Sequence, residues 1–286
     1  MTRIALILGG SGRMGRHAAQ AFAAAGWQVR RFDRATGDLA AAARGARIIV
    51  NAWNPPYPDW QAQVPALHDA VQQAALAAGA TVIVPGNVYV FGPSSPAPWS
   101  AASPHRATNP LGRIRIAMED SYRRSGTRTI LLRAGDFLDT EASGNWFDRM
   151  LAPGIARGRF TWPGDPDAAH AWAFLPDLAR AMVALADRAD DLPAFADIPF
   201  PGYTLSGRQM ADHLAGLVGH PLRIHRFPWW QLRLARPFWP LARHLLEMRY
   251  LWSLPHSLDG TRFRALCPDC PDTPVDEALA RAIRPL

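Results

Sequence analysis

The sequence contains no lysine, so all 31 of its residues counted as lysine or arginine are arginines. It contains two cysteines, Cys267 and Cys270, whose CxxC spacing has neither a second pair nor a nearby histidine to complete a zinc site. No charge-free apolar run approaches the roughly 20 residues that span a bilayer, and no signal-peptide pattern precedes the first expected strand. We therefore expect a cytoplasmic protein without a metal site.

The excess of basic residues is spread along the chain. The formal net charge is +7 and 49% of the residues are hydrophobic, which is enough for a large core in one two-lobed unit or two small domains. The arginines form no basic arm, so they are better explained as a solvated surface than as a nucleic-acid site. We expect a small-molecule substrate and no nucleic-acid partner.

The stretch from Arg3 to Gly15, RIALILGGSGRMG, organises the chain. An apolar run too short for a globular helix gives way to three regularly spaced glycines, and an alanine-rich helix follows. A strand that ends in such a turn, with a helix N-terminus behind it, is typical of a phosphate-binding corner. The turn residues expected to contact a bound dinucleotide are Gly9, Ser11, Gly12, Arg13, Met14 and Gly15.

Strand-like and helix-like segments then alternate. Strands are expected at 27–32, 46–53, 80–86 and 128–137, and helices at 38–45, 62–78 and 111–124. Continuous apolar strands joined by helices predict a parallel sheet covered on both faces, a Rossmann-like doubly wound α/β fold. We expect the dinucleotide-binding domain to comprise 1–140 plus about 171–200.

The remaining segments, about 141–170 plus 201–286, are expected to form a smaller, mostly helical C-terminal substrate lobe. In the dinucleotide-binding domain, a helix is expected from Ala173 and a strand near Ala194. In the lobe, a helix is expected at 206–219 and a short strand at 221–227.

The aromatic and basic stretch 228–252 has two interpretations. Its tryptophans and arginines could form an interfacial membrane helix, but Pro228, Pro237 and Pro240 interrupt it. We therefore favour a helical lobe that packs its aromatic side chains over a substrate cleft, and expect no membrane contact.

Several ordered motifs resemble the extended short-chain dehydrogenase/reductases, the NAD-dependent epimerase/dehydratase family. They are Gly9-x-x-Gly12-x-x-Gly15, Asp33 after the second strand, NVYVFGP at 87–93, NPLGRIRIAMED at 109–120, the strand containing Arg133 and FLPDLARA at 174–181. The resemblance covers most of the chain and implies a Rossmann-like fold that binds a nicotinamide dinucleotide. It also leaves open a homodimer through the helices at 62–78 and 111–124.

The second strand bears on the choice of cofactor. Asp33 lies 24 residues beyond Gly9, a spacing that suits a carboxylate on the adenosine ribose, where it would repel a 2′-phosphate. Arg34 and Arg13 could instead hold that phosphate. We expect NAD and keep NADP open, and we expect Asn51 and Ala52, at the end of the third strand, to contact the same cofactor.

The catalytic motif of the family is replaced. The resemblance implies a serine or threonine, a tyrosine acid/base and a lysine four residues after it, but these positions hold Asn87, Leu111 and Arg115. Arg115 can still supply positive charge and donate to a ribose hydroxyl, whereas Leu111 cannot move a proton. Tyr89, three residues before Gly92 where the family's dehydratases place a catalytic carboxylate, resembles a relocated acid; alternatively it only lines the pocket.

If residues 87–89 continue the strand, Asn87 and Tyr89 project to one side. The expected catalytic residues are therefore Tyr89, Asn87 and Arg115. His170 and His105 are weaker candidates for a proton shuttle, since a lone histidine is more often a hydrogen-bonded loop residue.

The substrate pocket is expected beyond the carboxyl ends of the strands. Asp136 stands where the family has an asparagine that helps to hold a nucleotide-sugar diphosphate, and a carboxylate there would repel a diphosphate; Asp136 could equally pair with Arg133. The other expected pocket residues are Trp53, Asn54, Tyr57, Asn145, Trp146, His170, Trp162 and Trp172.

Two functions fit these patterns. One is an NAD(P)-dependent oxidoreductase or epimerase-like enzyme that acts on a small, partly apolar substrate with a non-standard acid/base group. The other is a catalytically silent NAD(P)-binding regulator or sensor, since the tyrosine, lysine and serine of the family are all lost.

Overall fold

The computed structural model describes residues 3–35 and 37–286, whose strands form three sheets. The largest sheet has the order β2-β1-β3-β4-β5-β9 and is parallel throughout. Its strands are β1 (Ile4–Leu8), β2 (Gln28–Phe32), β3 (Ile48–Asn51), β4 (Thr81–Gly86), β5 (Thr129–Arg133) and β9 (Phe195–Pro199). The order reverses direction between β1 and β3, and ligands of such sheets bind at that point, beyond the carboxyl ends of the strands.

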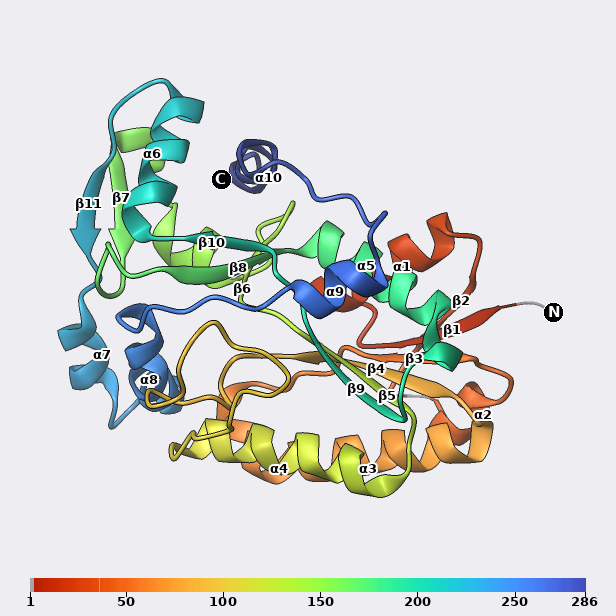
Figure 1. The fold of residues 1–286 in the computed structure, drawn as a ribbon. Coiled ribbons are helices and arrows are strands. Elements are labelled where there is room, and N and C mark those ends of the chain that lie inside the picture. The colour runs from red at the N-terminus through yellow and green to blue at the C-terminus, as the bar shows by residue number, and fades with distance from the viewer. Residues whose placement is uncertain (1–2, 36) are drawn as a thin grey trace.

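Helices cover both faces of this sheet (Figure 1), as the alternating pattern predicted. One face carries α1 (Arg13–Ala24) and α5 (Leu175–Asp187), and the other carries α2 (Leu39–Ala43), α3 (Trp60–Ala78) and α4 (Pro110–Ser125). Successive strand residues face opposite sides. Ile7 of β1 therefore packs in the core beneath α1 and α5, while its neighbour Leu8 packs in the core beneath α3 and α4.

Two smaller sheets extend the molecule beyond the main one. In the sheet β10-β8-β6, the central strand β8 pairs antiparallel with β10 and parallel with β6. In the other sheet, β11 pairs in parallel with β7. The strands are β6 (Asp136–Leu138), β7 (Arg159–Trp162), β8 (His170–Phe174), β10 (Tyr203–Leu205) and β11 (Arg223–Arg226). The expected C-terminal lobe thus contains the short strands β7, β10 and β11 besides its helices. β6 and most of β8, which come from segments expected in the dinucleotide-binding domain, form one sheet with β10.

The lobe's helices are α6 (Gly207–Val218), α7 (Trp229–Ala235), α8 (Pro240–Glu247) and α10 (Val275–Ile283). Short helical turns lie at Tyr57–Asp59, Phe147–Leu151, Ile155–Arg157, Ala189–Asp191 and Met248–Trp252. The remaining helix, α9 (Thr261–Leu266), packs with Phe263 and Cys267 against the core of the large sheet. The segment around α9, which we expected in the lobe, thus lies with the sheet.

Two expected boundaries next to β6 and β8 were wrong. The strand expected at 128–137 ends at Arg133, and β6 enters a different sheet after Gly135, whose added Cβ would lie 2.1 Å from the carbonyl oxygen of Ala171. The helix expected from Ala173 begins at Leu175, because β8 occupies the residues before it. Close packing of β8 on this segment, which no local pattern announces, explains both changes.

A further correction concerns Asn87 and Tyr89, whose side chains would project to one side if the strand continued through residues 87–89. β4 ends at Gly86, and the Asn87 side chain accepts a hydrogen bond of 3.0 Å from the backbone N–H of Tyr89. This is a turn that an asparagine side chain closes on the backbone two residues ahead. Strand alternation therefore does not determine where Tyr89 points.

No helix in the described part of the chain is both long and apolar enough to cross a membrane. Cys267 and Cys270 are free thiols at the edge of the large sheet's core, and burial raises the pKa of Cys270 to about 11.

Candidate functional site

The glycine turn has the geometry of a phosphate-binding corner. Gly9 adopts a φ of +72°, which L side chains rarely tolerate, and its carbonyl accepts a 2.9 Å hydrogen bond from the N–H of Gly12. A Cβ on Gly15 would lie 2.1 Å from that carbonyl oxygen. The three glycines thus let the backbone fold closely onto the start of α1.

The N-terminus of α1 is open to a ligand. Its N-cap, Gly12, makes no side-chain capping bond, the first turn holds no acidic residue, and both Ser11 and Gly12 are exposed. Exposed backbone N–H groups and the positive end of the helix dipole favour an anion at this place. The corner therefore fits the pyrophosphate of a dinucleotide.

The end of β2 forms the neighbouring part of the site. Asp33 is exposed there, and its Oδ1 accepts a 2.9 Å hydrogen bond from the N–H of Ala35. The Arg34 guanidinium carbon lies 5.9 Å from the centre of the Trp53 ring, and Trp53 also contacts Phe32 and approaches Gly9. Trp53, which we expected in the substrate pocket, lies beside Arg34 and Phe32 next to the glycine turn.

The two residues expected at the end of β3 differ. The backbone of Ala52 packs against Gly9, so close that a Cβ on Gly9 would lie 2.9 Å from the carbonyl oxygen of Ala52. The side chain of Asn51 is buried on the other side, where its amide lies 3.2 Å from His68 Nδ1 and 3.3 Å from the Tyr122 hydroxyl. The Asn51 side chain therefore ties β3 to α3 and α4 and does not face the cofactor corner.

Two tyrosines meet at the carboxyl end of β4. The hydroxyls of Tyr89 and Tyr57 are 2.5 Å apart, and both side chains are half-buried. Burial is the main cause that raises the pKa of both tyrosines, the nearby Asp136 carboxylate adds to it, and the Arg115 guanidinium opposes it. Both phenols are therefore protonated at neutral pH and can donate a hydrogen bond. We call this place the tyrosine corner.

Arg115, at the family's lysine position, is buried beside the tyrosines. Its guanidinium donates a 2.7 Å hydrogen bond to Asn54 Oδ1 and lies 4.1 Å from the centre of the Trp60 ring. The arginine is thus fixed towards the loop after β3, with Asn54 as its partner. It brings a positive charge to the tyrosine corner, as expected, but its orientation comes from residues on that loop.

Leu111, at the family's tyrosine position, is fully buried. Its backbone N–H donates a 2.6 Å hydrogen bond to Glu247, which also accepts a 2.7 Å bond from the side chain of Asn109. Glu247 belongs to α8, whose His244 lies with its ring centre 6.4 Å from that of Tyr57. No local pattern predicts this contact, because Leu111 and Glu247 are 136 positions apart in the chain.

Asp136 faces the lobe and does not pair with Arg133. Its Oδ2 lies 2.7 Å from His170 Nε2, and the His170 ring stacks on Trp252 with centres 4.4 Å apart. His256 lies 4.5 Å from His170, ring to ring, and burial lowers the pKa of His256 to about 3. His256 and Trp252 were not predicted, since only the three-dimensional fold brings the last loop of the lobe here.

Two expected pocket residues have other partners. The Asn145 side chain accepts hydrogen bonds of 2.8 and 3.2 Å from the N–H groups of Phe147 and Asp148, so it caps the following helical turn. Trp146 packs against Trp252, with ring centres 5.0 Å apart, in the aromatic core of the lobe. Trp162 and Trp172 are buried in that core as well.

Arg133 lies at the centre of a buried ionic cluster behind the tyrosine corner. It donates to Glu119 at 3.0 and 2.8 Å, to Asp197 at 3.3 and 2.6 Å, and to the carbonyl of Asn87 at 2.6 Å. His105, Glu119 and Asp197 could by spacing hold a metal ion, but the guanidinium already supplies the positive charge among these carboxylates. Arg133 therefore fixes the turn that carries Tyr89, and His105 lies at the edge of its cluster.

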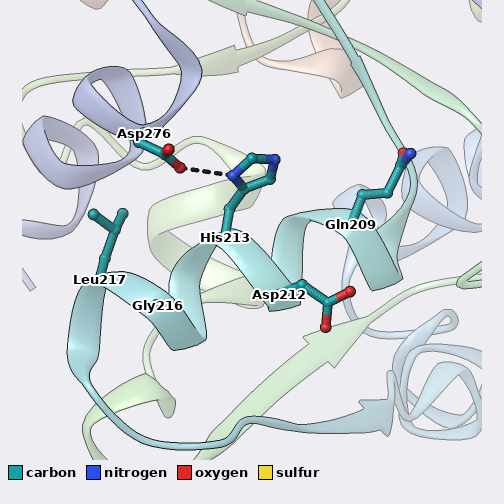
Figure 2. A pocket seen from close by; sticks show the side chains of 6 residues that line it. All are labelled: Gln209, Asp212, His213, Gly216, Leu217 and Asp276. Atoms are coloured by element: carbon teal, nitrogen blue, oxygen red, sulfur yellow. Dashed lines mark hydrogen bonds and ion pairs between the residues drawn. The ribbon is translucent and has the colours of Figure 1, made fainter.

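The hollow in Figure 2 lies away from both corners. It has a volume of about 600 Å³, and the described residues that line it are Gln209, Asp212, His213, Gly216, Leu217 and Asp276. A hydrogen bond of 2.6 Å between His213 and Asp276 joins α6 to the start of α10 beside it. The hollow thus lies on the outer surface of the lobe.

Comparison with solved structures identifies the fold. MoeE5, in a complex with UDP-glucose and NAD, matches with a TM-score of 0.76 and 16% identity, over 98% of this chain and 97% of its own. A nucleoside-diphosphate-sugar epimerase from Pseudomonas aeruginosa matches with 0.73 and 16%, over 100% and 97%. A dTDP-4-dehydrorhamnose reductase from Clostridium acetobutylicum matches with 0.72 and 15%, over 98% of each chain.

No protein-family model matches the sequence, and comparison with curated proteins also found no match. At these identities the structural matches establish the fold alone. The chain shares the fold of these structures over nearly its whole length, which confirms the Rossmann-like doubly wound fold expected from the ordered motifs.

Proposed function

We propose that the protein is an NAD(P)-dependent oxidoreductase or epimerase-like enzyme in which Tyr89 replaces the family's catalytic tyrosine. The observation that carries the proposal is the hydrogen-bonded pair of Tyr89 and Tyr57, 2.5 Å apart, beside the buried Arg115. The pair stands at the carboxyl end of β4, on the same edge of the sheet as the glycine turn.

The glycine corner supports a bound dinucleotide. The close packing of Gly15 on Gly9 and the open N-terminus of α1 suit a pyrophosphate, and the similar MoeE5 structure is a complex with NAD. Asp33 at the end of β2 suits ribose hydroxyls and favours NAD, while the neighbouring Arg34 keeps NADP open. A bound nicotinamide would supply or accept the hydride.

The chain's own residues supply the proton. A carbonyl that gains a hydride at carbon needs a proton at oxygen, and Tyr89 is a protonated phenol that can donate it. Tyr57 donates to or accepts from the Tyr89 hydroxyl, so it orients that group and can return a proton to it. Arg115 places positive charge where the phenolate of Tyr89 would form. A lysine plays this part in the short-chain dehydrogenase/reductases that the sequence resembles.

The surroundings of Asp136 favour a substrate without a diphosphate. The carboxylate is partly exposed, pairs with His170, and faces both tyrosines closely enough to raise the pKa of each. A diphosphate here would meet that negative charge at short range. The side chains of Tyr57 and Tyr89 beside this carboxylate are half-buried, and their rings suit a small and partly apolar molecule.

The alternative is a catalytically silent NAD(P)-binding regulator or sensor. The observation that favours it is the high pKa of Tyr89, which burial raises well above the ordinary value and which makes this phenol a weak acid. Such a protein would hold the dinucleotide at the glycine corner without transferring a hydride.

The first measurement is a titration of the purified protein with NADH and with NADPH, followed by nicotinamide fluorescence. We expect saturable binding of both, with NADH the tighter. Absence of binding at millimolar concentration would contradict both functions, because both need the dinucleotide.

The second measurement is hydride exchange with a panel of ketones, aldehydes and imines. Tyr89→Phe removes the proton donor, so we expect turnover to fall at least about 100-fold with NADH affinity unchanged. Tyr250→Phe is the matched control, since the buried Tyr250 hydroxyl has no partner among the described residues. Tight NADH binding by a parent protein that turns over no member of the panel would favour the silent regulator.

A further inference from the structure

The segment from Trp230 to Trp239 leaves large apolar side chains in solvent. The exposed fractions are 60% for Trp230, 68% for Leu234, 91% for Phe238 and 37% for Trp239. Other side chains of the same two helices, such as Trp229, pack in the core of the lobe. The stretch therefore packs one face into the core of the lobe and leaves the other face in solvent. We call the exposed face the α7–α8 tip.

The part of the chain that carries the α7–α8 tip is rich in exposed positive charge. The exposed charged side chains between residues 222 and 250 are Arg223, Arg226, Arg233, Arg236, Arg243 and Arg249. The one acidic residue in that stretch is Glu247, which is half-buried and accepts hydrogen bonds from Asn109 and Leu111. Over the described part of the chain, none of these six arginines forms an ion pair.

From this combination we infer that the α7–α8 tip docks on the surface of an anionic lipid bilayer. Exposed Trp, Leu and Phe side chains beside arginines have the composition of segments that lie in the interface, with apolar groups at the acyl boundary and cations at the lipid phosphates. The tip lies at the periphery of the molecule, far from the N-terminus (Figure 1). It would lie on the bilayer without spanning it.

A second copy of the chain suits the tip less well. A two-fold symmetric contact brings the same patch of both copies together, and here it would bring two sets of unpaired arginines into proximity. An anionic lipid surface complements both the charge and the apolar side chains. The inference does not depend on the proposed function, because it rests on residues outside the glycine and tyrosine corners.

The test is flotation of the full chain with two kinds of vesicle at physiological ionic strength. One kind is phosphatidylcholine alone, and the other contains equal amounts of phosphatidylcholine and phosphatidylglycerol. We expect binding to the anionic vesicles and little to the neutral ones. Failure to bind the anionic vesicles would overturn the inference.

Two double variants separate the apolar and the charged parts of the tip. Trp230→Ser with Phe238→Ser should weaken binding to the anionic vesicles at least tenfold, since it removes the inserted side chains. Arg233→Gln with Arg236→Gln should weaken it by roughly 25-fold, at about fivefold for each charge near the surface. All four positions are exposed, so thermal unfolding monitored by circular dichroism should match the parent's.

Matched controls carry the same changes elsewhere. Arg113→Gln with Arg124→Gln removes two exposed charges from α4, and Leu76→Ser with Leu217→Ser removes two exposed leucines from α3 and α6. Both controls should bind as the parent does. An equal loss in the α4 control would show attraction by net charge alone and would overturn the inference, and so would a dimer in gel filtration that the Trp230→Ser, Phe238→Ser variant dissociates.

Discussion

The two corners at the carboxyl edge of the sheet are built in opposite ways. The glycine corner comes from seven consecutive positions, Gly9 to Gly15, and its geometry follows from the absence of side chains there. The tyrosine corner joins Tyr57, Tyr89 and Arg115, which come from three separate segments. A local corner can be recognised from its own residues, whereas an assembled corner depends on the contacts that hold its parts in place.

The largest expected effect comes from removing the charge behind the tyrosine corner. Arg133→Met leaves Glu119 and Asp197 buried without their counter-charge, and such a loss typically costs about 3–5 kcal/mol of unfolding free energy. Urea denaturation measures it. Arg123→Met is the control, because Arg123 is exposed and its ion pair with Asp120 should contribute at most about 1 kcal/mol.

Adding Glu119→Gln and Asp197→Asn to Arg133→Met should restore part of that stability, because the buried negative charges are then gone. If the triple variant is no more stable than Arg133→Met, the loss comes from packing of the long side chain and the ionic explanation is wrong.

The next effect tests the glycine corner alone. Gly15→Ala places a Cβ 2.1 Å from the carbonyl oxygen of Gly9, so the turn must open, and we expect NADH affinity to fall at least about 100-fold, or about 2.7 kcal/mol. Gly216→Ala is the matched control: it also lies in a helix, and its Cβ would meet nothing within 4 Å. Unchanged NADH affinity in Gly15→Ala would show that the dinucleotide does not use this turn.

This difference between the corners explains which features could be predicted from the sequence. The strand run and glycine spacing of β1 and α1 are local, and so they predicted the strand, the tight turn and the helix that follows it. Asn87 shows the limit: a strand pattern appeared to continue to Tyr89, but the asparagine side chain closes a turn there. The aromatic stretch 228–252 shows a second limit. Its composition did not indicate which side chains, such as Phe238, stay exposed.

Contacts between distant segments could not be predicted at all. Arg115 occupies the expected position, but its partner Asn54 follows from how the loop after β3 packs on α4. Asp136 was expected either to repel a diphosphate or to pair with Arg133. Its observed partner is His170, which β8 brings beside it. Glu247 and His256 had no signal, because their contacts are made by a C-terminal segment that crosses back over the sheet edge.

The smallest expected effect is a pH dependence of the free energy of unfolding that comes from the buried His68. His68 links α3 to Asn51 and to the Tyr122 hydroxyl, 3.0 Å away, and burial lowers its pKa to about 3. The unfolded chain binds a proton at this histidine near pH 6.5, so stability is full above that pH and falls as the pH drops towards 3. Between pH 7 and pH 5 the expected loss from this one group is about 2 kcal/mol.

Urea denaturation at pH 7 and pH 5 compares the parent with His68→Gln, which cannot titrate, and with the control His220→Gln at a half-buried site outside this network. His68→Gln should lower stability at pH 7 but reduce the drop between the two pH values by about 2 kcal/mol, whereas His220→Gln should leave the drop unchanged. His256, whose pKa burial also lowers to about 3, contributes a second and separate part of the slope. If the drop in stability is as large in His68→Gln as in the parent, acid weakens the fold through other groups, and the contacts of His68 with Asn51 and Tyr122 do not make it pH-sensitive.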